Sequence, residues 1–165
     1  MSIWVPSPPK YSDGEAAGRS GSQASAPCRD RPIVLVVDDD ADDRQIYGMM
    51  LCYNGFDVAF ASSNATGVQA ARRYRPDLVL LDLGLPDGHG LDLCTEVRSW
   101  KDTADVPVLV LSGFRETELG EAARRAGCTA YIEKPANPID VMHRVEEIVG
   151  TPPLAGEGRP PRVLE

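Results

Sequence analysis

Residues 31–61 decide the fold, and their sequence is RPIVLVVDDDADDRQIYGMMLCYNGFDVAFA. The stretch begins with Ile33–Val37, an apolar β-branched run of strand length, and ends with a second such run at Val58–Ala61. Between them, Asp40 is a suitable N-cap for a helix over residues 41–53, where acidic residues in the first turn suit the helix dipole. The pattern predicts a strand, a helix and a second strand, the unit from which parallel sheets are built.

The same alternation continues to residue 149. Three further strands are expected at Leu78–Leu81, Val106–Leu111 and Thr129–Ile132. Helices are expected between Asn64 and Pro76 and over Gly90–Trp100, Thr117–Ala126 and Pro138–Val149. Strict alternation is typical of an α/β fold, here a (βα)5 doubly wound parallel sheet of five strands, with helices on both faces. We expect the strand order 2-1-3-4-5.

Two segments flank this predicted domain, which we place at residues 31–149. Residues 1–30 are rich in Ser, Gly, Pro and Ala, and their scattered apolar residues cannot bury enough surface to offset the entropy of ordering the backbone. Residues 150–165 are rich in Pro and Gly. We expect both segments to be flexible tails, although a Pro-rich tail can also be a short ligand for a partner protein.

The charge and cysteine content narrow the class of protein. The chain of 165 residues has a formal net charge of −8, which argues against binding to nucleic acid through its own electrostatics. The four cysteines are too far apart for a zinc-type motif and suit buried positions in a reducing compartment. We find neither a signal peptide nor the roughly 18 consecutive apolar residues of a membrane span, and expect a cytoplasmic protein.

Chemically reactive side chains follow four of the five predicted strands. Asp38 and Asp39 follow the first strand, Asp82 follows the third, Ser112 follows the fourth, and Lys134 closely follows the fifth. In the order 2-1-3-4-5 these four strand ends are neighbours, roughly 4.8 Å apart, and ligands bind at such carboxyl ends. Two carboxylates about 4 Å apart repel each other by roughly 4 kcal/mol at an effective dielectric constant of 20. The arrangement therefore predicts a bound cation.

The chemistry that suits these residues is the acceptance of a phosphoryl group. Mg²⁺ binds one or two carboxylates and also accepts phosphate oxygens, while a lysine and a hydroxyl donate to the same anion. A carboxylate nucleophile among these groups needs only to be held in line with the phosphorus. Neither the GxGxxG motif nor the GxxxxGK[ST] motif is present, so dinucleotide and P-loop sites are excluded.

Four motifs in order resemble the receiver domain of two-component response regulators. They are VLVVDDD (residues 34–40), LVLLDLGLPDGHG (78–90), VLVLSG (108–113) and YIEKP (131–135). The resemblance covers residues 31–149 and implies a flavodoxin-like fold. The chain departs from the family at Gly88, where a large apolar residue is more common, and at His89, where Asp or Ser is more common.

The resemblance implies a role for each matching residue. Asp82 would accept a phosphoryl group from a phosphohistidine on a sensor histidine kinase or a histidine phosphotransfer protein, with Lys134 and Ser112 contacting that group. Ser112 and Tyr131 would form the conformational switch: on phosphorylation Ser112 would move toward the phosphoryl group, and Tyr131 would swing inward. Mg²⁺ would be held by the residues matching the metal ligands, which are Asp38, Asp39, Asp82 and the backbone carbonyl of Gly84.

The sequence thus favours a stand-alone, single-domain response regulator in a phosphorelay, because we expect the 16 residues after Val149 to be too few to fold into an output domain. Its own chemistry would be limited to Mg²⁺-dependent self-phosphorylation from a phosphodonor and autodephosphorylation, so we do not class it as an enzyme. Output would pass through contact with a downstream protein, or through a homodimer, on the face formed by the fourth helix, fifth strand and fifth helix. One alternative is a receiver-like interaction module that works without phosphorylation. Another is a metal-dependent phosphatase.

Overall fold

The computed structural model describes residues 30–153 and 158–165, and shows five helices and eight strands in those ranges. The strands of the main sheet are β1 (Ile33–Val37), β2 (Asp57–Ala61), β3 (Leu78–Leu81), β6 (Val108–Ser112), β7 (Ala130–Glu133) and β8 (Val163–Leu164). The helices are α1 (Ala41–Tyr53), α2 (Asn64–Tyr74), α3 (Gly90–Arg98), α4 (Glu116–Arg125) and α5 (Pro138–Val149). Two very short strands, β4 (Gly84–Leu85) and β5 (Gly88–His89), pair with each other. The expected N-terminal tail at residues 1–30 lies outside the described residues, apart from Asp30.

The main sheet is parallel, and its order is β7-β6-β3-β1-β2-β8. Its first five members are the five predicted strands, so the predicted order 2-1-3-4-5 is confirmed. Strand β1 lies in the middle, with Val36 beside Phe60 of β2 on one side and Leu80 of β3 on the other. This order makes the carboxyl ends of β1, β3, β6 and β7 neighbours.

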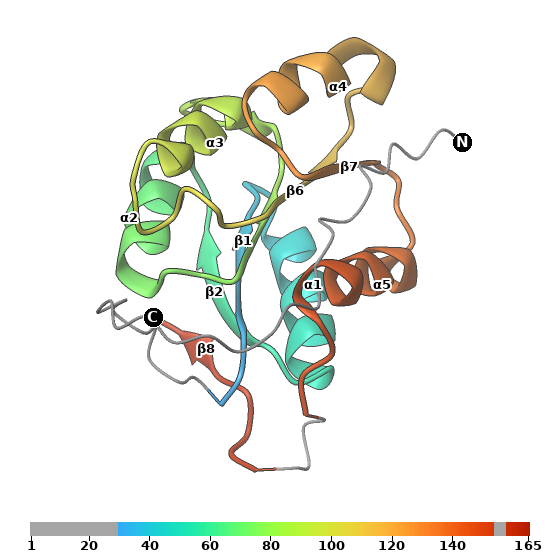
Figure 1. Cartoon of the computed structure of the whole chain (residues 1–165). Helices are drawn as coiled ribbons and strands as arrows, with labels where there is room; N and C mark the ends of the chain where they lie inside the picture. The colour runs from blue at the N-terminus through green and yellow to red at the C-terminus, as the bar shows by residue number, and fades with distance from the viewer. Residues whose placement is uncertain (1–29, 154–157) are drawn as a thin grey trace, which may run out of the picture.

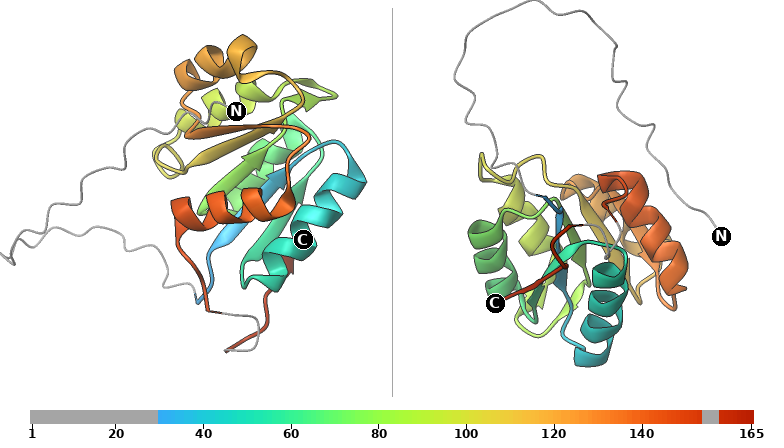
Figure 2. Two further views of the ribbon diagram at one scale, coloured as in Figure 1. Left: turned by 90° about the vertical axis from the view of Figure 1, so that its right-hand side faces the viewer. Right: turned by 90° about the horizontal axis from the view of Figure 1, so that it is seen from below.

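Helices cover both faces of the sheet, as Figures 1 and 2 show. On one face, Leu35 and Val37 pack into a core with residues of α2, α3 and α4. On the other face, Val34 and Val36 pack with residues of α1 and α5. All five residues of β1 are buried, which explains why its sequence is apolar throughout rather than alternating.

Most predicted helix ends are confirmed because their signals are local. The Asp40 side chain accepts hydrogen bonds from the N–H groups of Asp42 and Asp43 and so caps α1. Helix α2 ends at the residue before Arg75, which precedes Pro76 and adopts a left-handed conformation. The predicted third helix was two residues too long, because α3 ends at Arg98 rather than Trp100.

Strand β8 departs from the expectation of a five-stranded sheet followed by a flexible tail. It lies parallel to β2, and Val58 of β2 donates a backbone hydrogen bond to the Arg162 carbonyl (2.9 Å). The segment is held by an ion pair in which both Asp57 oxygens accept from the Arg159 guanidinium, at 3.0 and 2.5 Å. Figure 1 shows that this part of the chain returns from the end of α5 to the edge of the sheet. Contacts distant in sequence, rather than local propensity, therefore order residues 158–165.

The ion pair of Asp57 is expected to make stability depend on pH. Burial alone raises the pKa of Asp57, but hydrogen bonds from Arg159 and from the Arg162 N–H outweigh it and hold the pKa below its usual 3.8. The ionised carboxylate therefore contributes stability above pH 3.8, and this contribution is lost as the pH falls through the lowered pKa. Asp57→Asn should lower the urea midpoint most near neutral pH, and the difference from wild type should shrink in acid. A difference that is constant with pH would contradict this.

Within the described ranges, none of the helices combines the length and the apolar character needed to cross a membrane.

Candidate phosphoryl-accepting site

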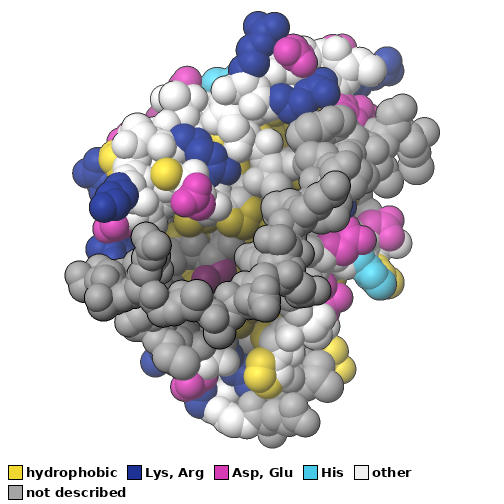
Figure 3. All heavy atoms as spheres, viewed as in Figure 1, with side chains coloured by type: hydrophobic (Ala, Val, Ile, Leu, Met, Phe, Trp, Pro, Cys, Tyr) yellow, Lys and Arg dark blue, Asp and Glu magenta, His cyan; other side chains and the backbone are white. Residues whose placement is uncertain are grey.

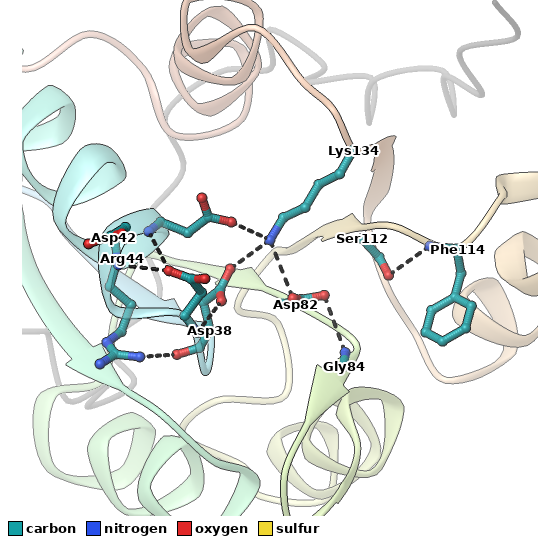
Figure 4. A network of polar contacts seen from close by, with 10 residues as sticks. Asp38, Asp42, Arg44, Asp82, Gly84, Ser112, Phe114 and Lys134 are labelled. Atoms are coloured by element: carbon teal, nitrogen blue, oxygen red, sulfur yellow. Dashed lines mark hydrogen bonds and ion pairs between the residues drawn. The ribbon is translucent and has the colours of Figure 1, made fainter.

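The fold brings the reactive side chains together at the carboxyl ends of the parallel strands. Asp38 follows β1 directly, Asp82 follows β3 directly, Ser112 is the last residue of β6, and Lys134 follows β7 directly. Figure 4 shows the Lys134 side chain pointing toward Asp38 and Asp82. The pairing of β1 with β3, of β3 with β6 and of β6 with β7 creates this proximity, so residues 96 positions apart in sequence come into contact.

Three aspartates form a compact group of oxygen donors. One carboxylate oxygen from each of Asp38, Asp39 and Asp82 lies within 4.8 Å of the others. Asp38 is buried, Asp82 is half-buried and Asp39 is exposed, so the group opens to solvent on one side. Carboxylate oxygens are the ligands that Mg²⁺ prefers, and the metal keeps several waters, which an open side allows. The donor set therefore fits Mg²⁺.

Lys134 provides a positive charge beside these carboxylates. Its Nζ donates to Asp43 at 2.7 Å, to Asp38 at 2.8 Å and to Asp82 at 3.3 Å. Burial tends to lower the pKa of Lys134, but the hydrogen bonds to Asp38 and Asp43 and the charge of Asp82 raise it above its ordinary value. Lys134 therefore stays protonated, and its ammonium lies beside the Asp82 carboxylate.

The loop after β1 holds Asp38 in place. The Asp38 side chain accepts a hydrogen bond from the Asp40 N–H at 2.9 Å, and its backbone carbonyl accepts one from the Arg44 guanidinium at 2.6 Å. Figure 4 shows Arg44 on the side of Asp38 away from Lys134. Burial raises the pKa of Asp38, and the hydrogen bonds from Lys134 and Asp40 partly offset that rise. A further cation at this position would stabilise the ionised form.

The turn after Asp82 is shaped by close backbone approaches. The Gly84 N–H donates to Asp82 Oδ1 at 3.2 Å, and Gly84 and Leu85 then pair with Gly88 and His89. A Cβ on Gly90 would lie 2.5 Å from the Asp82 carbonyl oxygen, so only glycine fits where α3 begins. His89 caps α3, because its Nδ1 accepts from the Leu91 N–H. The departures at Gly88 and His89 thus shape the hairpin that follows Asp82.

Ser112 on β6 and Tyr131 on β7 both contact Phe114 in the loop between β6 and α4. Ser112 is fully buried, and its hydroxyl accepts a hydrogen bond from the Phe114 N–H at 3.3 Å. Tyr131 is 6% exposed, and its hydroxyl donates to the Phe114 carbonyl at 2.8 Å. Tyr131 therefore occupies an inward position, and both side chains are tied to the same residue of the β6–α4 loop.

Two residues of the site were not identified from the sequence. The sequence predicts for Asp43 only a place among the acidic residues of the first helical turn, yet Asp43 makes the shortest contact to Lys134. Gly90 was interpreted only as the start of a helix.

A sheet of this order, with clustered aspartates and a lysine at its strand ends, defines a receiver domain. A family model described as the response regulator receiver domain matches residues 34–146, and the chain therefore belongs to this family of two-component systems. The chain is 36% identical over 115 residues to the DNA-binding response regulator MtrA of Mycobacterium tuberculosis (strain ATCC 25618 / H37Rv), covering 70% of this chain and 49% of MtrA. The chain thus spans about half the length of the curated relatives it matches.

Solved structures share the fold. The CheY-like receiver domain protein of Methanospirillum hungatei JF-1 has a TM-score of 0.67 and 26% identity, covering 71% of this chain and 92% of that one. The receiver domain of the sensor histidine kinase PA1611 of Pseudomonas aeruginosa PAO1 also has a TM-score of 0.67, with 24% identity, and covers 73% of this chain and 99% of that one. That structure contains a magnesium ion coordinated in its active-site cleft.

Proposed function

We propose that this chain accepts a phosphoryl group on Asp82 from a phosphohistidine donor and passes the signal on through protein contacts in a phosphorelay. The observation that carries the proposal is the position of the Asp82 carboxylate. It lies within 4.8 Å of oxygens of Asp38 and Asp39, and its Oδ2 contacts the Lys134 ammonium at 3.3 Å. A carboxylate that accepts a phosphoryl group gains negative charge. The neighbouring cation-binding oxygens and the ammonium suit that reaction because they can balance the added charge.

The transfer step needs no other nucleophile. An Asp82 carboxylate oxygen attacks the phosphorus as the bond between phosphorus and the histidine nitrogen breaks. The electron pair of that bond goes to the imidazole, which then takes up a proton. Lys134 donates a hydrogen bond to a phosphoryl oxygen. Asp38, Asp39, Asp82 and the Gly84 carbonyl would hold Mg²⁺, which would neutralise charge on the phosphoryl oxygens.

A phosphoryl group on Asp82 would also change the contacts at the ends of the neighbouring strands. The Ser112 hydroxyl, now accepting from the Phe114 N–H, would turn to donate to a phosphoryl oxygen. That movement would loosen the loop whose Phe114 carbonyl accepts from Tyr131. Phosphorylation would thus shift the packing around Phe114 from one arrangement to another. In this way a charge added at Asp82 would change the nearby protein surface.

The surface that would transmit this change is formed by α4, β7 and α5. Figure 3 shows basic and acidic side chains next to each other over α4. Helix α4 carries Glu121 in contact with both Arg124 and Arg125, at 3.3 and 3.2 Å. A surface with charges of both signs suits a polar, reversible contact with a downstream protein or with a second copy of the chain.

The proposal is tested by incubating the protein with Mg²⁺ and acetyl phosphate and measuring its intact mass at low temperature. We expect the wild-type protein to gain one phosphoryl group, and both Asp82→Asn and wild type in excess EDTA to gain none. Ser112→Ala is expected to retain phosphoryl uptake at a lower rate, since it keeps the nucleophile. Absence of added mass, or added mass that persists in Asp82→Asn, would overturn the proposal and favour a module that works without phosphorylation.

A further inference from the structure

Asp43 makes the shortest contact to the lysine of the site. Its Oδ2 accepts from Lys134 Nζ at 2.7 Å, compared with 2.8 Å for Asp38 and 3.3 Å for Asp82. Asp43 lies in the first turn of α1, and 36% of its side chain is exposed, whereas Asp38 is 4% exposed. The ammonium is thus drawn toward α1 and makes its longest contact with the residue expected to be phosphorylated.

The contacts of Lys134 use its full donor capacity. A lysine ammonium has three N–H donors, and three carboxylates accept from this one. The donor now directed at Asp82 can pass to a phosphoryl oxygen. To bring the ammonium closer to that oxygen than its present 3.3 Å from Asp82, however, one of the two shorter contacts, to Asp38 or to Asp43, must be released or weakened. Asp38 cannot easily be released, because it is buried and would lose the charge that compensates it. Asp43 can be released at low cost, since its carboxylate is partly exposed to water.

We propose that Asp43 is a positioning residue that holds Lys134 in the resting state and competes with the phosphoryl group for it. This inference rests on the proposed function of Asp82. Phosphorylation then exchanges the contact between Lys134 and Asp43 for one between Lys134 and a phosphoryl oxygen. Asp43 therefore raises the cost of occupying the site with an anion and keeps the unphosphorylated state favoured.

Asp42 provides a matched control for Asp43. It is the preceding residue of α1, it is exposed, and both residues donate their N–H groups to the Asp40 side chain. Among the described residues, the carboxylates paired with Lys134 are those of Asp38, Asp43 and Asp82, so Asp42 is outside that group. Asp42→Asn and Asp43→Asn remove the same charge from the same helical turn, and only the second removes a charged partner of Lys134.

The test is a calorimetric titration with beryllofluoride, an analogue of the phosphoryl group on a carboxylate, at saturating Mg²⁺. We expect Asp43→Asn to bind beryllofluoride about 5-fold more tightly than wild type, in keeping with the loss of one partly exposed ion pair. Asp42→Asn should differ from wild type by less than about 2-fold. Asp43→Glu restores a carboxylate within reach of Lys134 and should return the affinity toward the wild-type value.

A separate titration with Mg²⁺ alone distinguishes competition for Lys134 from a general change at the site. In Asp43→Asn, Mg²⁺ should bind no more tightly than in wild type, because a negative charge is lost and Lys134 is freed to move toward Asp38 and Asp82. Tighter anion binding without tighter metal binding is the expected signature.

The outcomes separate this inference from the function on which it rests. If wild type binds beryllofluoride but Asp43→Asn binds it equally or more weakly, the competition is disproved and the proposed function stands. If Asp42→Asn changes the affinity as much as Asp43→Asn, the effect is one of net charge and the inference also fails. If wild type binds no beryllofluoride and takes up no phosphoryl group, the proposed function fails and this inference fails with it.

Discussion

Lys134→Met is expected to slow phosphoryl uptake by about 100-fold or more, the usual cost of removing one donor aimed at developing negative charge. The Lys134 ammonium lies 3.3 Å from the Asp82 carboxylate and is held there by Asp38 and Asp43, so it is placed to contact a phosphoryl group on Asp82. The rate is measured with acetyl phosphate at saturating Mg²⁺. Lys101→Met, which alters an exposed lysine, is the control and should match wild type.

The same substitution should also destabilise the metal-free protein. Three carboxylates would lose their shared cation, and Asp38 would be left buried and uncompensated. Removing one partner of a buried pair costs roughly 3 kcal/mol in the free energy of unfolding, and Mg²⁺ bound to the folded state should restore part of that loss. Urea unfolding in EDTA and in Mg²⁺ measures both effects. If Lys134→Met is as stable as wild type in EDTA, Lys134 does not have this neutralising role.

The sequence predicted the sheet well because the signals of its strands are strong and local. An apolar run without alternation, such as Ile33–Val37, can only be buried on both faces, and cores on both sides of β1 explain that composition. Helix ends were also predictable, because capping residues and prolines act within a few residues. The N-cap Asp40 indicates the start of α1, and Pro76 indicates the end of α2. Topology then placed Asp38, Asp82 and Lys134 together without any knowledge of side-chain geometry.

The features that were missed depend on contacts between distant segments. Strand β8 contains two residues within a Pro- and Arg-rich segment, and its order comes from Asp57 and Arg31, more than 100 positions earlier. A buried aspartate at the start of an apolar strand is a signal that a cation lies nearby, but the sequence does not identify which arginine provides it. The contact of Asp43 was missed for a similar reason, since its direction depends on the path of Lys134 from β7.

Arg31→Met is expected to detach the C-terminal segment from the edge of the sheet. Arg31 is 1% exposed. Its guanidinium donates to the carbonyls of Gly55 (2.9 Å), Pro153 (2.5 Å) and Arg159 (2.8 Å). One buried cation thus joins the residues before β1, the turn before β2, and the chain on either side of residues 154–157. Removing it leaves these three carbonyl oxygens without that donor, and hydrogen bonds to charged groups contribute about 1.5–3 kcal/mol each.

We expect Arg31→Met to lower the free energy of unfolding by roughly 3 kcal/mol, because methionine fills much of the volume but donates no hydrogen bond. Amide exchange adds a local measurement, since the Val58 N–H is protected by the Arg162 carbonyl and should exchange faster once β8 is released. Arg115→Met, at an exposed position directly before α4, should change neither quantity. If Arg31→Met lowers stability while the Val58 amide keeps its relative protection, Arg31 stabilises the core without holding β8. Because β8 lies beyond β2, on the edge of the sheet away from β7, its release should leave phosphoryl uptake on Asp82 unchanged.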